Sequence, residues 1–141
     1  ESYSSQIDGV TGIPDFDFTN PNKAVYASVT DGSGGWYIGG DFTKVGDSIR
    51  NGLAHIDNNG CVSKWNPNAK TDGNPLNIAV WDLVISNSVI YAGGSFISIG
   101  GKSRKGIAAI DVNTGLATSW NANCDGDVFS LALSKCIPGV A

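Results

Sequence analysis

The sequence predicts an all-β protein, and three observations carry that prediction. Val and Ile together supply 24 of the 141 residues, whereas Leu supplies 6 and Glu and Gln one each, so residues that favour helices are scarce. Glycine occurs 19 times, largely in polar clusters between short apolar stretches, which is typical of tight turns between strands. Motifs also recur at a long, nearly fixed spacing. A helical bundle is excluded.

Charge and hydropathy exclude two classes of partner. The 9 basic and 13 acidic residues give a formal net charge of −4, and the basic residues are scattered along the chain. The protein therefore has no electrostatic footprint for a nucleic-acid backbone or an anionic bilayer. No apolar run approaches the roughly 20 residues of a membrane span, and no charged and then apolar leader opens the sequence. We expect neither nucleic-acid binding nor membrane insertion.

The internal repeat is the most informative feature of the sequence. The segment Tyr37–Phe42, which reads YIGGDF, returns 54 residues later as Tyr91–Phe96, which reads YAGGSF. The residues that follow recur at spacings of 54 and then 55, because one turn is a residue longer in the second copy. A third copy begins at Val128–Leu133. The recurring pairs include Arg50 and Arg104, Gly52 and Gly106, Ile56 and Ile110, Asp57 and Asp111, and Trp65 and Trp120.

Each repeat is expected to form four short strands joined by tight turns. In the first repeat the expected strands are Val25–Thr30, Trp36–Gly40, Gly52–Asp57 and Cys61–Trp65, with a polar loop at Asp41–Asn51. The turns that need positive φ are Asp31–Gly35 and Asn58–Gly60 in the first repeat, and Asn87–Ser88 and Asn113–Gly115 in the second. Four antiparallel strands in every 50 or so residues is the spacing of a β-propeller blade.

Three features together resemble a known kind of blade. An apolar pair followed by Gly-Gly closes the second strand, an Ile-Asp pair precedes a glycine-containing turn, and a tryptophan follows that glycine by five residues. This combination covers Val25–Ser134 and resembles kelch-type blades as well as the repeats of bacterial secreted proteins called delta-60-like β-propellers. Ile56 and Ile110 stand where kelch blades usually carry tyrosine, so the bacterial type is the closer likeness. The resemblance implies a scaffold with diverse binding roles and transfers no catalytic residue.

We accordingly expect about two and a half propeller blades. Residues 1–24 are expected to form the outer strand of a preceding blade and a linker, 25–78 the first full blade, 79–127 the second, and 128–141 the inner strand of a third. Each blade of a propeller buries its two faces against its neighbours, and closed propellers contain roughly 4–8 blades. The ring is therefore expected to be closed by further blades of a longer polypeptide or by other copies of this chain.

Eight recurring residues are expected to have structural roles. Paired glycines let a neighbouring sheet or a bulky indole approach the backbone closely. The aspartates stand at the mouths of turns, where a carboxylate accepts hydrogen bonds from backbone N–H groups two residues on. The two tryptophans hold equivalent places after an alternating strand, as core residues do. These residues are Gly39, Gly40, Gly93, Gly94, Asp57, Asp111, Trp65 and Trp120.

Other side chains are candidates for ligand binding. Trp36 has no equivalent in the second repeat and is a candidate surface residue, with sugar stacking as one of its uses. Loops at one end of a propeller form the usual binding rim, and two equivalent loops carry paired asparagines, which are also good turn formers. These asparagines are Asn66, Asn68, Asn121 and Asn123.

Two acidic clusters are candidates for a calcium site, and no other cofactor is expected. Asp15 lies close to Asp17 in the sequence, and Asp125 lies close to Asp127 in the loop before the third copy. Carboxylates on flexible loops suit Ca²⁺, but the spacing is not that of an EF-hand. The alternative interpretation is that these are solvated turn carboxylates.

No catalytic residue is predicted. His55 is the single histidine, its equivalent in the second repeat is Ala109, and it lies within an expected strand. A serine, histidine and aspartate site or a cysteine and histidine site needs that histidine in a pocket. A core or sheet-surface role for His55 is the preferred interpretation.

The cysteines argue against zinc and against a disulfide framework. Cys61, Cys124 and Cys136 include no C-x-x-C pair. If Val128–Ser134 is an extended strand, Cys124 and Cys136 lie too far apart for a disulfide. Free or differently paired thiols are expected.

The expected function is that of a noncatalytic scaffold. We expect a β-propeller segment of a secreted or cell-surface protein, bacterial by its resemblance, that interacts with other copies of itself, with further blades, or with a protein or glycan ligand. Met is absent, position 1 included, which favours a processed product or a segment of a longer chain. Two alternatives stay open, namely an oligomeric carbohydrate-binding propeller lectin and a fragment of a propeller enzyme whose active site lies outside this chain.

Overall fold

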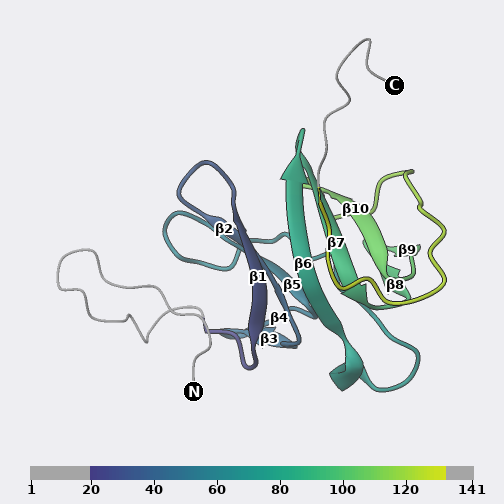
Figure 1. Ribbon diagram of the computed structural model, residues 1–141. Helices are drawn as coiled ribbons and strands as arrows, with labels where there is room; N and C mark the ends of the chain where they lie inside the picture. The colour runs from purple at the N-terminus through teal and green to yellow at the C-terminus, as the bar shows by residue number, and fades with distance from the viewer. Residues whose placement is uncertain (1–19, 133–141) are drawn as a thin grey trace, which may run out of the picture.

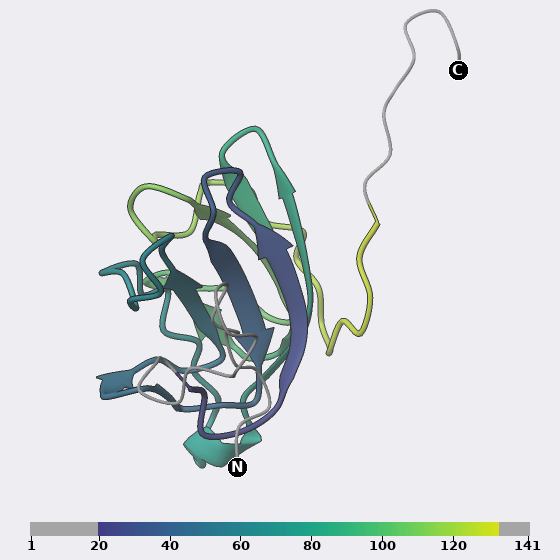
Figure 2. The same ribbon diagram turned by 90° about the vertical axis from the view of Figure 1, so that its left-hand side faces the viewer.

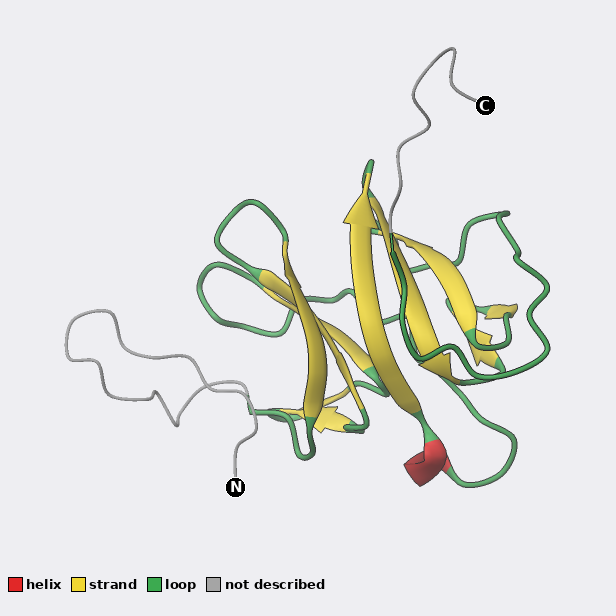
Figure 3. Cartoon of the chain, in the orientation of Figure 1, coloured by secondary structure: helices red, strands yellow, loops and turns green. Residues whose placement is uncertain are grey.

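The computed structural model describes residues 20–132, which form two three-stranded antiparallel sheets that face each other and two small two-stranded sheets (Figure 1). The strands are β1 (Val25–Thr30), β2 (Trp36–Gly40), β3 (Lys44–Val45), β4 (Ser48–Ile49), β5 (Leu53–Ile56), β6 (Ala79–Ser86), β7 (Val89–Ser95), β8 (Ser98–Ile99), β9 (Lys102–Ser103) and β10 (Ile107–Asp111). A 3-10 turn, Pro75–Asn77, precedes β6 (Figure 3). In residues 20–132 there is no helix with the length and apolar character needed to cross a membrane. The all-β prediction is confirmed.

The two sheets have the same strand order and the same irregularity. The first sheet is ordered β1-β2-β5, and the second is ordered β6-β7-β10. Each first strand carries one extra residue against its neighbour, at Tyr26 in β1 and at Trp81 in β6. The hairpin turns adopt the expected positive φ, as at Gly32 (81°), Asn87 (51°) and Ser88 (63°). The sequence repeat is therefore also a repeat of structure, and we call residues 25–78 the first unit and 79–127 the second.

The prediction of four strands in each sheet is wrong for the residues described. Both named sheets have three strands, and the expected fourth strand, Cys61–Trp65, reaches the first sheet only through a bridge between Ile56 and Val62. After Ser63, whose N–H donates to the His55 carbonyl oxygen at 2.9 Å, the chain leaves the sheet. It turns away because the Trp65 side chain reaches across to the second sheet, where its Nε1 donates to the Asp111 carbonyl oxygen at 2.9 Å.

The loop expected at Asp41–Asn51 contains a small hairpin. Strands β3 and β4 pair around Gly46, whose φ is 59°, and β8 and β9 form the equivalent hairpin in the second unit. Two-residue strands give a weak alternation signal, which is why the sequence pattern does not reveal them. These hairpins place Phe42 and Phe96, each nearly fully buried, beside their sheets.

The two three-stranded sheets pack face to face, and one apolar core lies between them (Figure 2). Alternation along β2 and β5 directs Tyr37 and Leu53 into this core, while Gly39 leaves space for Val80 and Leu83 of β6. The buried members of the core are Tyr37, Leu53, Trp65, Ala69, Ile78, Val80, Leu83, Ile90, Ala92, Phe96, Ile99, Ala108, Ile110 and Ala117.

The third copy lies against the outer face of the second sheet, although its described residues form no strand. The Val128 N–H donates to the Gly94 carbonyl oxygen at 3.1 Å, and the Leu131 N–H donates to Asp82 Oδ2 at 2.7 Å. Phe129 stacks on Trp81 with ring centroids 4.5 Å apart. Residues 1–19 and 133–141, including most of the expected preceding outer strand, lie outside the described residues.

Candidate functional site

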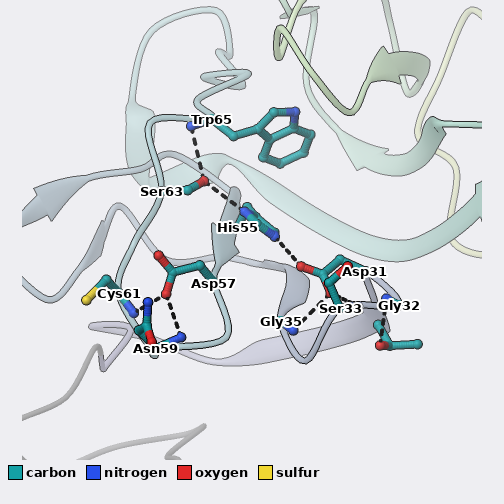
Figure 4. Close-up of polar contacts among 11 residues, drawn as sticks. Asp31, Gly32, Ser33, Gly35, His55, Asp57, Asn59, Cys61, Ser63 and Trp65 are labelled. Carbon is teal, nitrogen blue, oxygen red and sulfur yellow. Dashed lines mark hydrogen bonds and ion pairs between the residues drawn. The ribbon is translucent and has the colours of Figure 1, made fainter.

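His55, the one histidine of the sequence, belongs to a connected series of side-chain hydrogen bonds (Figure 4). His55 lies on β5 two residues after Leu53, so alternation turns its ring to the same face as Tyr37. The two rings are in contact, with centroids 4.4 Å apart and planes tilted by 31°. Contact with Tyr37 restricts the orientation of the imidazole and leaves both of its nitrogens available at the ring edge.

Asp31 holds one ring nitrogen of His55. It begins the loop between β1 and β2, where its Oδ1 accepts hydrogen bonds from the N–H groups of Ser33 at 2.7 Å and Gly35 at 2.9 Å. Its Oδ2 lies 2.8 Å from His55 Nε2. A Cβ on Gly35 would overlap the Asp31 carboxylate, so a glycine is required for this loop to close around it.

Ser63 holds the other ring nitrogen. Its Oγ lies 2.8 Å from His55 Nδ1, and it also accepts a longer hydrogen bond from the Trp65 N–H at 3.3 Å. An ionised carboxylate only accepts, so Nε2 of His55 carries a proton; in the neutral ring Nδ1 is then the acceptor for the Ser63 hydroxyl. The three side chains Asp31, His55 and Ser63, called the triad below, thus form a connected chain from carboxylate to hydroxyl.

The surroundings favour the ionised carboxylate of Asp31. Burial raises the pKa of the Asp31 carboxyl, but hydrogen bonds from His55, Ser33 and Gly35 and the charge of His55 outweigh it, so the pKa lies below its ordinary value of 3.8. The His55 and Asp31 side chains are 16% and 12% exposed, so solvent reaches the edge of the site.

Replacing Asp31 is expected to change the acid sensitivity of the fold. A lowered folded-state pKa contributes stability above pH 3.8, and this contribution is lost as the pH falls through the folded-state value. We expect Asp31→Asn to lower the free energy of unfolding by about 1–2 kcal/mol near pH 7 and by less near pH 3. Urea unfolding at both pH values tests this, with Asp125→Asn as a control at an exposed carboxylate. A deficit of the same size at both pH values would contradict the role of the Asp31 charge.

Of the residues expected to bind ligands, only Asn66 and Asn68 lie together in a groove. A groove of about 210 Å³ lies at the seam between the units, lined by Asn66–Asn68 and Lys70 of the first unit and Ser98, Gly100, Gly101, Gly115 and Leu116 of the second. Asn68 and Asn123 share a φ of 55°, so their two loops have similar local geometry. Asn121 and Asn123 are exposed and, like Trp36 at the start of β2, are not part of this groove.

The expected calcium ligands are not gathered into a site in the described part of the chain. Residues 20–132 contain no group of three or more histidine, cysteine, aspartate or glutamate side chains arranged to hold a metal ion, so Asp125 and Asp127 gain no further acidic ligand. Asp15 and Asp17 lie outside the described residues. Cys61 and Cys124 are free thiols, while Cys136 also lies outside the described range.

The paired glycines have two different neighbours. The first glycine of each pair faces apolar side chains that follow in the chain, Val80 and Leu83 for Gly39, and Val128 and Leu131 for Gly93. The second glycine faces backbone, since a Cβ on Gly40 or Gly94 would overlap the carbonyl oxygen of Ala24 or Ala79. At none of these four glycines do the three atoms nearest to an added Cβ belong to Trp65 or Trp120, so the close neighbours are the adjoining backbone and apolar side chains and not an indole.

The aspartates of the Ile-Asp pairs close the turns that follow them. Asp57 Oδ1 accepts from the Asn59 and Cys61 N–H groups at 2.9 and 3.0 Å, and Asp111 Oδ1 accepts from Asn113 and Thr114 at 2.7 and 3.1 Å. Each carboxylate satisfies two backbone donors of its turn.

Removing one of these turn carboxylates is expected to have a moderate effect on stability. We expect Asp111→Ala to lower the free energy of unfolding by about 1 kcal/mol, because two backbone donors lose their acceptor and are left to water. Asp47→Ala, at an exposed position of the β3–β4 turn, is the matched control and is expected to change it by less than about 0.5 kcal/mol. The measurement is the midpoint of urea unfolding, compared at an unchanged dependence of the unfolding free energy on urea concentration. Equal midpoints for the two variants would contradict the role of Asp111 in the turn.

Two functional features escaped the sequence reasoning. Arg50 and Arg104 each anchor the segment that follows the third strand of their sheet. In the first unit, Arg50 Nη2 donates to the Ser63 carbonyl oxygen at 2.9 Å. In the second unit, Arg104 Nη2 donates to the Thr118 carbonyl oxygen at 3.0 Å. Burial lowers the pKa of the Arg50 guanidinium below its ordinary value. The recurrence of the arginine was the available signal. For the triad, the available signal was a difference between the repeats, because the second repeat has Ala109 at the position of His55.

Comparisons with known proteins give no relative from which a function follows. No protein-family model matches the chain, and neither a curated protein nor a solved structure matches it. The repeat, the packing of the two sheets and the side-chain geometry are therefore the features that bear on function.

Proposed function

We propose that the chain is a β-propeller segment, of the kelch or delta-60-like kind, that acts as a structural and interaction scaffold in a secreted or cell-surface protein. One observation carries the proposal. The contact of Gly39 with Val80 and Leu83 of the next unit recurs as the contact of Gly93 with Val128 and Leu131 of the third copy. Successive units that contact only their neighbours, in a constant manner, are the hallmark of repeat architectures.

The two sides of each unit support the same arrangement. Apolar residues on the far side of the first sheet form a separate buried cluster, and their equivalents in the second unit belong to the core between the sheets. A unit preceding the first would therefore meet a surface of the same type that the second unit presents to the first. The cluster is Ile38, Phe42, Val45 and Ala54, and the equivalents are Ala92, Phe96, Ile99 and Ala108.

A junction with a preceding segment also recurs. The Gly46 N–H donates to the Asn20 carbonyl oxygen at 2.9 Å, as the Gly100 N–H donates to that of Pro67 at 2.7 Å. Asn20 thus meets the β3–β4 hairpin as the end of the first unit meets the β8–β9 hairpin. This geometry supports the expectation that the residues before Val25 belong to a preceding blade.

The aromatic pair of each unit supports the need for a following unit. Trp65 packs edge-on against Tyr37 at 4.9 Å, and Trp120 packs edge-on against Tyr91 at 5.6 Å. Trp65 is 6% exposed and donates its indole N–H to Asp111 of the second unit, whereas Trp120 is 43% exposed and donates to none of residues 20–132. In the proposed ring, a following unit covers Trp120 and supplies a carbonyl oxygen for it.

Oligomeric state tests the scaffold proposal. Light scattering at low micromolar concentration is expected to show either an assembly of several copies or a chain that folds only with further blades. A folded chain that stays a monomer of 14.6 kDa at this concentration would contradict the proposal, whereas an assembly that dissociates only on further dilution would agree with it. Trp120→Arg is expected to dissociate an assembly and Trp36→Arg to leave it intact, because both indoles are about half exposed but only Trp120 lies on the proposed contact face. Equal behaviour of the two variants would exclude that face.

A carbohydrate-binding propeller is the second candidate, and the groove at the seam favours it. Amide side chains of Asn66 and Asn68 and the Lys70 ammonium line this groove, and such groups hydrogen-bond sugar hydroxyls. A glycan array with the intact assembly tests the idea, with Asn66→Ala as the variant expected to lose binding. If no glycan binds, or if Asn66→Ala binds equally well, this candidate is removed.

A further inference from the structure

We propose that Ser63 is a nucleophile toward activated acyl and phosphoryl groups, with His55 as its general base and Asp31 as the residue that positions the base. The inference goes beyond the scaffold function and does not depend on it. Its basis is the triad geometry, in which two hydrogen bonds of 2.8 Å link hydroxyl, imidazole and carboxylate in one line (Figure 4). A hydroxyl hydrogen-bonded to an imidazole that a third group orients is the arrangement that activates a serine.

Two neighbours, Asp31 and Tyr37, fix the orientation of the His55 ring. Asp31 is itself held by the Ser33 and Gly35 N–H groups, Tyr37 covers one ring face, and the carboxylate places the proton on Nε2. The nitrogen that faces Ser63 is therefore Nδ1, whereas serine hydrolases generally use Nε2 for this purpose. General-base catalysis requires only that the nitrogen beside the hydroxyl is unprotonated, so either nitrogen serves.

The second unit shows that the fold does not require the triad. There the Thr118 N–H donates to the Ala109 carbonyl oxygen at 2.8 Å, just as the Ser63 N–H donates to that of His55 at 2.9 Å. The backbone is thus the same with alanine in place of histidine. The base and its carboxylate are additions at one unit, which is the pattern of a site grafted on a repeated scaffold.

Groups for stabilising developing negative charge lie next to Ser63. The backbone N–H of Lys64 donates no hydrogen bond to any of residues 20–132, and the Lys64 side chain is exposed. Ser63 itself is partly exposed. A free N–H directly after the nucleophile is the kind of donor that stabilises an oxyanion.

The reaction follows from these positions. Ser63 Oγ attacks the carbonyl carbon of an activated ester and gives its proton to His55 Nδ1, and the new O–C bond forms a tetrahedral oxyanion. Collapse breaks the bond to the leaving alkoxide or phenoxide, which takes the proton from His55. Water then attacks the acyl group by the same route and restores Ser63. With a phosphorofluoridate, an O–P bond forms, the P–F bond breaks, and fluoride and the proton leave.

Covalent labelling with diisopropyl fluorophosphate tests the proposal. We expect one diisopropylphosphoryl group on Ser63, located by peptide mass spectrometry of the full chain, and none on Thr118, the equivalent hydroxyl without a histidine. His55→Ala is expected to lower the labelling rate on the order of 100-fold, and Asp31→Asn on the order of 10-fold. Release of p-nitrophenol from p-nitrophenyl acetate is expected to fall in parallel.

Several results would overturn the proposal. Failure of Ser63 to react, reaction only at tyrosines or lysines, or an unchanged rate in His55→Ala would each show that the triad does not activate this serine. If near-UV circular dichroism shows that His55→Ala does not fold, the comparison of Ser63 with Thr118 in the unaltered chain decides. Labelling at both hydroxyls or at neither then counts against the proposal.

Discussion

Trp65→Ala is expected to lower the free energy of unfolding by about 3–5 kcal/mol. The indole is 6% exposed, packs edge-on against Tyr37, and carries the hydrogen bond from the first unit to the Asp111 carbonyl oxygen of the second. Truncation leaves a cavity between the units and removes a hydrogen bond that joins them. Urea unfolding followed by far-UV circular dichroism measures the change.

Trp120→Ala is the matched control for this prediction. Trp120 occupies the equivalent place and has the equivalent aromatic partner, Tyr91, but it is 43% exposed and makes no described link to a following unit. Measured below the concentration at which copies associate, its loss is expected to cost less than about 1.5 kcal/mol. Equal losses for the two tryptophans would show that the link between units contributes little to the stability of the pair.

The sequence repeat predicts the fold well wherever local patterns decide it. Alternation places β1 and β2 at the expected residues, and the positive φ values of Asn87 and Ser88 occur where a two-residue hairpin needs them. The recurrence of Gly39 and Gly93 predicts close approach of a neighbour without naming it. These features depend on residues near one another in the chain, so one sequence is enough to read them.

Contacts between distant residues explain what the sequence did not predict. The expected fourth strand is shortened because Trp65 leaves its sheet for the second one, a contact that spans 46 positions. The triad joins Asp31 to His55 over 24 positions and His55 to Ser63 over 8. No local period reports such pairs, and a histidine that alternates with apolar neighbours reads as a sheet residue until its partners are known.

Burial of a side chain by a neighbouring unit also cannot be predicted from local sequence patterns. Trp65 and Trp120 are indistinguishable by position in the repeat, and both are expected to be core residues, yet among the described residues only Trp65 is buried and hydrogen-bonded to the unit that follows it. Trp120 is thus exposed because it lacks a contact with a following unit, and not because the second unit differs from the first in its own residues. In a repeat architecture, the burial of a residue therefore depends on the adjoining unit as well as on its own unit.

Gly94→Ala is expected to destabilise the fold by about 3 kcal/mol, the upper part of the range for overpacking. A Cβ at this position would overlap the Ala79 carbonyl oxygen and crowd Val80 Cα at 2.8 Å, so β6 and β7 cannot keep their pairing without a backbone shift. Gly93→Ala is expected to cost less, because its nearest neighbours are side-chain atoms of Val128 and Leu131 at 3.1 and 3.2 Å, which can move.

Gly126→Ala separates this steric effect from the general effect of replacing glycine. A Cβ at Gly126 has nothing within 4 Å, and its φ is not in the left-handed region, so the substitution is expected to be neutral or slightly stabilising through the unfolded chain. The urea midpoint should therefore be highest for Gly126→Ala, lower for Gly93→Ala and lowest for Gly94→Ala. If Gly94→Ala proves no worse than Gly93→Ala, backbone crowding within the sheet is not what selects the second glycine of each pair, and contact between units must select both.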